Sequence, residues 1–213
     1  MKQKSPKKID PSERPPRPVR LKTPLTHEVR IIGGLWKRTK LAVADKPGLR
    51  PTPDRVRETL FNWLGQDLTG WRCMDAFAGT GALGFEAASR GAKEVTLVEQ
   101  DTALVAQLKR VQMQLQASAT QVVRGDGVMA LKHLDPASMD AVFIDPPFDS
   151  DLFEAALQAA SRAVALEGFV YLEAPVLWAD ERLAVIGLKL HRHLKAGAVH
   201  AHLLKRLGDH HVP

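Results

Sequence analysis

The amino-acid sequence predicts an α/β protein whose parallel β-sheet is covered by helices on both faces, and three observations support this class. From residue 72 onward, short apolar runs typical of buried strands alternate with longer segments of helical periodicity, as in right-handed β-α-β units. Several of these runs end in an acidic residue, as expected where strands meet a ligand-binding edge. The length of 213 residues suits one domain with a small addition.

The expected elements alternate until the last part of the chain. We expect strands at Arg72–Phe77, Glu94–Glu99, Gln121–Arg124, Ala141–Ile144 and Gly168–Glu173, and helices at Thr80–Arg90, Thr102–Gln116, Gly127–His133 and Leu152–Leu166. The two strand-like segments that follow, Leu183–His193 and Ala198–Arg206, flank Lys195-Ala196-Gly197. They predict a closing antiparallel hairpin.

Composition divides the chain into three regions. Residues 1–27 contain six prolines and eight Lys or Arg, which predicts a disordered basic tail. Residues 28–66 are expected to form an extension of one hairpin and one helix, and residues 67–208 the main domain.

The extension has recognisable turn and cap signals. Val29–Ile32 and Lys40–Val43 predict a small hairpin with a basic loop between them. Thr52 is the expected N-cap of the helix that follows, with Pro53 at its first position. We expect this helix to end at about Leu64.

Charge is distributed unevenly along the chain. Residues 1–60 carry 16 Lys and Arg against 6 Asp and Glu, residues 61–180 carry 8 against 16, and residues 181–213 carry 6 against 2. An acidic middle between basic ends suggests a catalytic core flanked by segments that bind a polyanion. For residues 1–27 the alternative is a tail that only improves solubility.

The single cysteine and the hydropathy pattern indicate the compartment. Cys73 cannot form an internal disulfide and is most simply a core residue, which suggests a reducing cytoplasm. No apolar run approaches the roughly 20 residues of a membrane helix. The basic N-terminus is not followed by the apolar stretch of a secretory signal, so we expect a cytoplasmic protein.

The most informative stretch is the apolar run that ends in Asp145-Pro146-Pro147-Phe148. Two prolines cannot continue a central strand, so the chain must leave the sheet there. The exit offers a carboxylate, a carbonyl and an aromatic ring. These groups suit a planar nitrogen-bearing ring, with the aromatic stacked on its face and the oxygens accepting from an exocyclic amine. We assign Asp145, Pro146 and Phe148 to the catalytic site.

A glycine turn follows the first strand of the main domain. Gly79, Gly81 and Gly84 have the G-x-G-x-x-G spacing, which alone also fits a nicotinamide dinucleotide. Asp75, four residues before the first glycine, favours a different ligand, because a carboxylate there repels a pyrophosphate but accepts from an α-ammonium group. The pattern favours an amino-acid-bearing nucleotide such as S-adenosylmethionine. We assign Asp75, Phe77, Gly79 and Gly81 to its binding.

Two further strand ends offer acidic residues to the same nucleotide. Glu99 ends the second strand at the distance where an acidic residue accepts from ribose hydroxyls, and we assign Glu99 and Gln100 to this part of the cofactor. Asp101 is more simply a helix N-cap. Asp126 and Gly127 follow the third strand, where Asp126 either accepts from the adenine amino group or caps the next helix. The two roles are compatible.

These residues resemble class I S-adenosylmethionine-dependent methyltransferases, and Asp-Pro-Pro-Phe resembles the motif of enzymes that methylate exocyclic amines. Over about residues 29–206 the chain resembles the bacterial RsmD family of 16S ribosomal RNA guanine-N2 methyltransferases. The stretches that carry this resemblance are Arg30–Gly34, Leu49–Thr52, Asp54–Leu64 and Asp75–Gly84. The resemblance implies a Rossmann-like, seven-stranded, mostly parallel sheet with an antiparallel last strand. It also implies 16S rRNA in an assembling small ribosomal subunit as substrate. We expect a monomer.

A basic, partly aromatic group of residues beside the catalytic core is the expected RNA contact. Its members are Trp36, Lys37, Arg38, Lys40, Arg50, Arg55 and Arg57. Phosphate binding by such residues weakens steeply with salt. The alternative for Arg55 and Arg57 is that they are solvated or pair with acidic residues of the core.

Asp145 also bears on which base is methylated. Guanine presents two neighbouring N–H donors, which a carboxylate matches, whereas adenine presents one donor and one acceptor, which an asparagine amide matches better. Adenine enzymes with Asp at this position also exist, so an adenine-N6 or protein-glutamine methyltransferase stays open. An NAD-dependent oxidoreductase shares the glycine turn but accounts for neither Asp75 nor Asp145. A non-enzymatic RNA-binding module leaves the acidic strand ends unexplained.

The histidines of the closing hairpin are candidate metal ligands. His191, His193, His200 and His202 alternate on two strands and could face one another. Cys73 is remote and the hairpin contains no acidic residue, so we expect no metal site. Exposure at the sheet edge, or a contribution to RNA binding, is the favoured interpretation.

Overall fold

A computed structural model of the chain describes residues 28–42 and 52–208. The predicted tail over residues 1–27 and the predicted RNA contact Arg50 lie outside the described residues.

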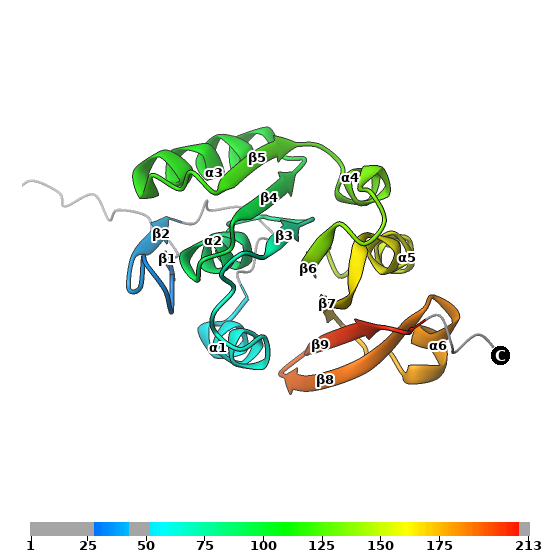
Figure 1. Cartoon of the computed structure of the whole chain (residues 1–213). Helices are drawn as coiled ribbons and strands as arrows, with labels where there is room; N and C mark the ends of the chain where they lie inside the picture. The colour runs from blue at the N-terminus through cyan, green and yellow to red at the C-terminus, as the bar shows by residue number, and fades with distance from the viewer. Residues whose placement is uncertain (1–27, 43–51, 209–213) are drawn as a thin grey trace, which may run out of the picture.

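A seven-stranded sheet with the order β5-β4-β3-β6-β7-β9-β8 forms the centre of the molecule (Figure 1). The strands are β3 (Arg72–Asp75), β4 (Glu94–Glu99), β5 (Thr120–Arg124), β6 (Met139–Ile144), β7 (Val164–Ala174), β8 (Leu188–Ala196) and β9 (Val199–Arg206). The strands from β3 to β7 are paired in parallel, and β9, the last in the chain, is antiparallel to both β7 and β8. The expected Rossmann-like sheet with an antiparallel last strand is confirmed.

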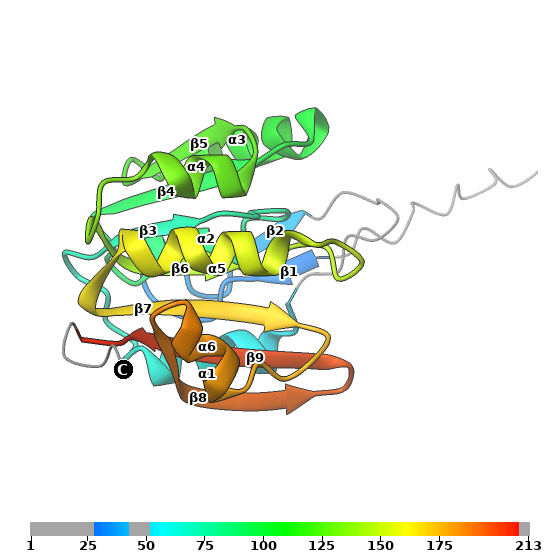
Figure 2. The same cartoon turned by 90° about the vertical axis from the view of Figure 1, so that its right-hand side faces the viewer.

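Six helices among the described residues cover the two faces of the sheet (Figures 1 and 2). They are α1 (Asp54–Trp63), α2 (Ala82–Ser89), α3 (Thr102–Leu115), α4 (Gly127–His133), α5 (Leu152–Ala163) and α6 (Asp180–Val185). Side chains of α1, α2 and α3 share one hydrophobic cluster with the sheet, and those of α4, α5 and α6 share a second. Within the described ranges, no helix is long and apolar enough to cross a membrane.

Several element boundaries differ from the predictions, including those of β3, β7, β8 and α5. The segment from Leu183 begins as helix α6, and β8 starts only at Leu188, because Gly187 turns the chain with a φ of 75°. Helix α5 ends at Ala163, because Val164 already pairs with β6. The N-cap position of α1 is Pro53, and no side chain caps this helix, so the prediction of Thr52 as N-cap was wrong.

The N-terminal hairpin of β1 (Glu28–Arg30) and β2 (Lys40–Ala42) is held to the main domain by one carboxylate of α2. Glu86 is fully buried and accepts from the backbone N–H groups of Ile32 at 2.7 Å and Gly33 at 2.8 Å. Its charge is balanced by Arg90 at 2.8 Å and by Arg57 at 3.5 Å. The hairpin therefore depends on a buried ionic group.

Arg57 joins the hairpin, α1 and α2 from a fully buried position. Its guanidinium donates to the carbonyl oxygens of Thr52 at 3.2 Å and Arg30 at 2.8 Å, and it pairs with Asp54 at 2.6 Å. A side chain with no exposed surface cannot contact RNA, so the prediction of Arg57 as an RNA contact was wrong. The alternative prediction for Arg57, that it pairs with acidic residues, is confirmed.

The two arginines at the start of α1 provide a matched test of this role. Arg57→Met should lower the free energy of unfolding by about 3–5 kcal/mol, because it leaves the Glu86 carboxylate buried with less compensation. Arg55→Met, at an exposed position of the same turn, should change it by less than about 0.5 kcal/mol. Urea unfolding followed by circular dichroism measures both values. Equal effects of the two substitutions would contradict the assignment.

Candidate active site

The acidic strand ends gather at the edge where the strand order of the sheet reverses. The chain places β4 and β5 on one side of β3 and later adds β6 and β7 on the other. Such a switch point leaves a crevice outside the carboxyl ends of the two central strands. Asp75 pairs in register with Phe143, so Asp145 leaves the neighbouring strand two residues further on. The predicted cofactor and catalytic segments therefore lie side by side.

The glycine turn between β3 and α2 is braced by Glu99 at the end of β4. The Gly79 N–H donates to Glu99 Oε2 at 2.9 Å, and the Asp101 N–H donates to Oε1 at 2.8 Å. Gly81 then opens α2 with a φ of 78°, a conformation that a side chain would strain. Glu99 thus holds both the turn and the start of the next loop, and it remains partly exposed toward the crevice edge.

Asp75 is buried at the end of β3 and is electrostatically strained. Its Oδ2 accepts from the Gly84 N–H at 2.9 Å, and only 2% of the residue is exposed. Burial raises the pKa of Asp75 from 3.8 to about 7, against the lowering effect of the Gly84 hydrogen bond, and the charges of Glu99 and Glu173 raise it further. A cation beside Asp75 would relieve this unfavourable charge.

The loops after β4 and β5 carry the remaining predicted cofactor residues. Asp101 is the N-cap of α3, as predicted, and Asp126 caps α4 by accepting from the Met129 N–H at 2.8 Å. Gly127 lies so close to β3 that a Cβ there would stand 2.1 Å from the Ala76 carbonyl oxygen. Of the two roles predicted for Asp126, the structure shows the helix cap. Because the residue is exposed, it is also accessible to a nucleotide. Among the other predicted cofactor residues, Gln100 is exposed and Phe77 is half-buried.

The Asp-Pro-Pro-Phe segment leaves the sheet immediately after β6, as predicted. Pro146 is buried, whereas Phe148 is 38% exposed beyond the strand ends. Burial, together with the negative charges of Glu173 and Asp75, raises the pKa of Asp145 well above 3.8. The Thr52 side chain opposes this shift through a hydrogen bond. Asp145 is therefore a carboxyl group held among other carboxyl groups.

Glu173 and Thr52 were not predicted as site residues. Glu173 lies near the end of β7, next to Asp145, and accepts from the Tyr171 hydroxyl at 2.8 Å. Burial raises its pKa, and Thr52 hydrogen-bonds to it as well as to Asp145. One hydroxyl carries one proton, so it can donate to only one of the two carboxylates. Glu173 was detectable in the sequence as the acidic end of a predicted strand, whereas nothing local distinguishes Thr52 from a helix cap.

The turn with Trp36, Lys37 and Arg38 packs against the main domain, but at a distance from the strand ends. The Trp36 N–H donates to Ser89 Oγ at 2.9 Å, at the C-terminal end of α2. Helix α2 begins at the glycine turn and rises about 1.5 Å per residue, so the turn lies roughly 12 Å away along the helix. Lys37 and Arg38 are exposed there and Trp36 is half-buried.

The other basic residues predicted to contact RNA have different surroundings. Lys40 is exposed and pairs with Glu28 at 2.7 Å. Arg55 is exposed on the first turn of α1, which begins next to Thr52. Arg55 is therefore exposed on the helix that begins next to Thr52, the residue whose hydroxyl contacts the acidic strand ends.

The fold and the strand-end motifs define a Rossmann-like class I methyltransferase. A solved Escherichia coli structure, provisionally assigned as a methyltransferase, superimposes with a TM-score of 0.72 at 37% identity, covering 85% of this chain and 99% of that one. A family model described as "Conserved hypothetical protein 95" matches residues 29–205. The chain belongs to this family, the bacterial RsmD family.

Two curated relatives carry the name "Ribosomal RNA small subunit methyltransferase D". The protein of Escherichia coli strain K12 is 41% identical over 183 residues, which cover 84% of this chain and 90% of the relative. The protein of Haemophilus influenzae is 48% identical over 133 residues, which cover 61% of this chain and 69% of the relative.

The buried charge of Asp75 should make stability depend on pH. Its folded-state pKa is raised, so its contribution to stability is fully present below about pH 4 and is lost as the pH rises through about 7. Asp75→Asn removes this loss while keeping an acceptor for Gly84. The difference in unfolding free energy between the variant and the original protein should therefore shift in favour of the variant by roughly 2–3 kcal/mol when the pH is raised from 5 to 8. Urea unfolding at both pH values measures this, and a difference independent of pH would contradict the assignment.

Proposed function

We propose that the protein transfers a methyl group from S-adenosylmethionine to the exocyclic N2 of a specific guanine in 16S rRNA of the small ribosomal subunit. The observation that carries the proposal is the placement of Asp145-Pro146-Pro147-Phe148 beside the Asp75 glycine turn at one switch point. The names of the relatives support ribosomal RNA of the small subunit as the substrate. The choice of guanine N2 rests on Asp145 and on the family.

The residues at the strand ends suit a cationic cofactor. Asp75 lies where its carboxylate can accept from the α-ammonium group, with Phe77, Gly79 and Gly81 forming the turn around it. In this proposal Glu99 and Gln100 bind the ribose, and Asp126 and Gly127 bind the adenine. Crowded carboxyl groups whose pKa values are raised favour a ligand that brings positive charge. When bound, S-adenosylmethionine supplies an electrophilic methyl group on its sulfonium.

The Asp-Pro-Pro-Phe segment would hold the base. The lone pair of the guanine amino group is delocalised into the ring, so its nitrogen is a poor nucleophile. Asp145 and the Pro146 carbonyl can accept its two N–H groups and favour a tetrahedral nitrogen, while the exposed Phe148 ring stacks on the base at a gain of roughly 1–3 kcal/mol. A base within a helix or a stacked loop must first be turned out into the site. The rate enhancement then comes mainly from alignment.

Glu173 and Thr52 act on Asp145 as positioning residues in this proposal. Asp145 must be ionised to accept from both guanine donors, and the negative charge of Glu173 opposes its ionisation. The Thr52 hydroxyl contacts both carboxyl groups but can donate its proton to only one of them. The protonation of one carboxyl group therefore depends on that of the other. The N-terminal extension thus contributes directly to the catalytic group.

The substrate and setting follow from the same proposal. We expect a monomer in the cytoplasm, where ribosomal subunits are assembled, and no metal ion in the transfer step. A substrate as large as a subunit particle can reach both Arg55 and the distant turn with Lys37 and Arg38. Trp36 and Lys40 are the other described residues that we propose to contact RNA.

The pH profile of the reaction tests the coupling between the two carboxyl groups. Glu173→Gln removes a negative neighbour of Asp145, so the acid limb of kcat/KM against pH should move to lower pH. Glu167→Gln is the control, because Glu167 lies on the same strand but far from the site and pairs with Lys205 at 3.4 Å. If the acid limb of the Glu173→Gln profile does not move, Glu173 has no positioning role.

Loss of the protein from its cells tests the function itself. Mass spectrometry of nucleosides from 16S rRNA should then show loss of one N2-methylguanosine, restored by the original chain but not by Asp145→Ala. Asp145→Asn should restore it only weakly, since an amide matches two donors poorly. Intact N2-methylguanosine with loss of a methylated adenosine would favour the adenine alternative, and an unchanged RNA would reject both.

A further inference from the structure

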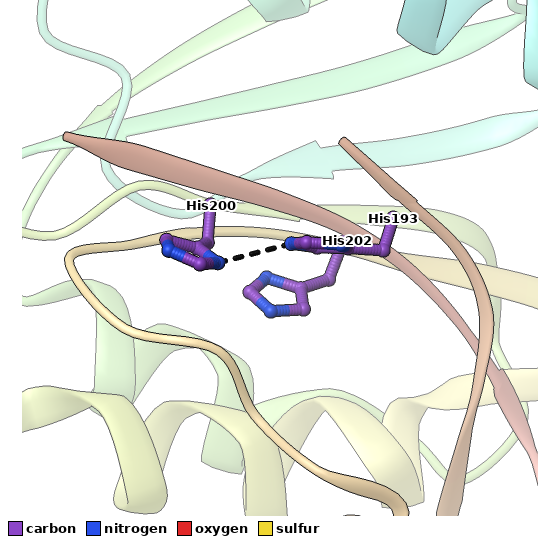
Figure 3. A group of neighbouring side chains, drawn as sticks. All are labelled: His193, His200 and His202. Carbon is purple, nitrogen blue, oxygen red and sulfur yellow. Dashed lines mark hydrogen bonds between the residues drawn. The ribbon is translucent and has the colours of Figure 1, made fainter. Parts of the chain in front are cut away.

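Three histidines of the β8–β9 hairpin meet on one face of the sheet (Figure 3). His193 is the register partner of His202, and His200 lies two residues before His202 on β9. The ring nitrogens of the three side chains lie within 4.8 Å of one another, and His193 Nε2 is 3.0 Å from His200 Nδ1. His191 is not part of this group, since its ring lies against Phe169.

The arrangement follows from strand geometry. Side chains two residues apart on a strand point to the same face, and a residue directly across an antiparallel pair points there too. A His-x-His pair on one strand and a third histidine opposite it therefore converge. This provides three nitrogen ligands, the set that zinc uses when its fourth position stays open.

His202 has one of the two features of a metal ligand: its Nδ1 faces a backbone carbonyl, although its Nε2 already accepts a hydrogen bond. Its Nε2 accepts from the Trp178 N–H at 3.1 Å, so the ring proton is on Nδ1, which faces the Leu172 carbonyl at 3.3 Å. A histidine that binds a metal commonly donates its second ring N–H to a backbone carbonyl in this way.

We propose that His193, His200 and His202 form a binding site for a divalent transition-metal ion, Zn²⁺ in particular. Zn–N bonds of about 2.0–2.1 Å at tetrahedral angles place two ligand nitrogens roughly 3.3 Å apart, close to the spacing of His193 and His200. The third nitrogen needs a small ring movement to join them. This proposal replaces the expectation of no metal site, which rested on the remoteness of Cys73 and the absence of an acidic residue in the hairpin.

The proposed site is separate from the methyl-transfer site. His202 is the register partner of Leu172, whose side chain belongs to the cluster beneath α5 and α6. Glu173, the next residue of β7, points to the opposite face. The exposed Lys195, across from His200, is the nearest cation in the hairpin and lowers affinity for a metal without blocking the ligands.

Metal binding would act on the segment between β7 and α6. The Nε2 atom of His202 is the ligand nitrogen and also the acceptor for Trp178, so the metal competes with this hydrogen bond. The Trp178 ring is buried under the Arg182 guanidinium, 3.5 Å from its centre. Its fluorescence should therefore report occupancy of the site.

The test is titration of the full chain, without an affinity tag, with Co²⁺ and Zn²⁺. Co²⁺ should give the visible absorption bands of a tetrahedral site at one ion per chain, and Zn²⁺ should displace it. His193→Ala and His200→Ala should each weaken binding at least about 10-fold. His191→Ala, on the same strand, should leave it unchanged. The fluorescence change should disappear in Trp178→Phe.

The sequence supplies a second control, because His210 and His211 lie near the C-terminus, outside the described residues. A double His210→Ala, His211→Ala variant should bind as the original chain does, and loss of binding there would overturn the proposal. Binding that survives both His193→Ala and His200→Ala, or no saturable binding, would also overturn it. His202 is fully buried, so the partly exposed His193 and His200 carry the test, with circular dichroism confirming that their variants fold.

Discussion

The buried pairing of Arg57 with Glu86 is the interaction on which the arrangement of the N-terminal extension depends. Glu86 holds the hairpin backbone, and Arg57 holds the carbonyl oxygens of Arg30 and Thr52. Loss of either group would leave the other buried with only its remaining partner, Arg90 for Glu86 and Asp54 for Arg57, and reduced compensation of a buried charge is costly. Formation of the pair therefore requires that the hairpin, α1 and α2 come together. It also brings Thr52 to the two carboxyl groups at the ends of β6 and β7.

The same preference for compensated charge explains the chemistry of the strand ends. Asp75, Asp145 and Glu173 lie at one edge, and burial raises the pKa of each, with repulsion from neighbouring carboxylates adding to the effect at Asp75 and Asp145. The fold accepts this unfavourable arrangement because the backbone amides of the glycine turn and the Thr52 hydroxyl stabilise it in part. A site built in this way attracts positive charge and hydrogen-bond donors. Both properties agree with a methyl donor that is a sulfonium and with a base that offers N–H donors.

Much of this site could be predicted from local sequence signals. The prolines after Asp145 and the glycines after Asp75 mark the positions where strands end, and the ends of parallel strands share one edge. The prediction was weaker where a side chain has two plausible environments. Arg57 has the composition of a surface residue in a basic segment, yet it is buried, because its partners Arg30 and Glu86 are remote in sequence. The turn around Trp36 is likewise displaced from the core edge by its docking on the far end of α2.

The sequence alone determined the α/β class, the acidic strand ends and the Asp-Pro-Pro-Phe exit. Each of these depends on apolar periodicity and on residues that stop a strand, which act over a few positions. Only the tertiary structure decided that Thr52 lies between Asp145 and Glu173, and that His193 meets His200 and His202. Those contacts depend on the strand register and on the packing of the extension against the sheet. Both are set by pairing between distant segments, which local patterns do not encode.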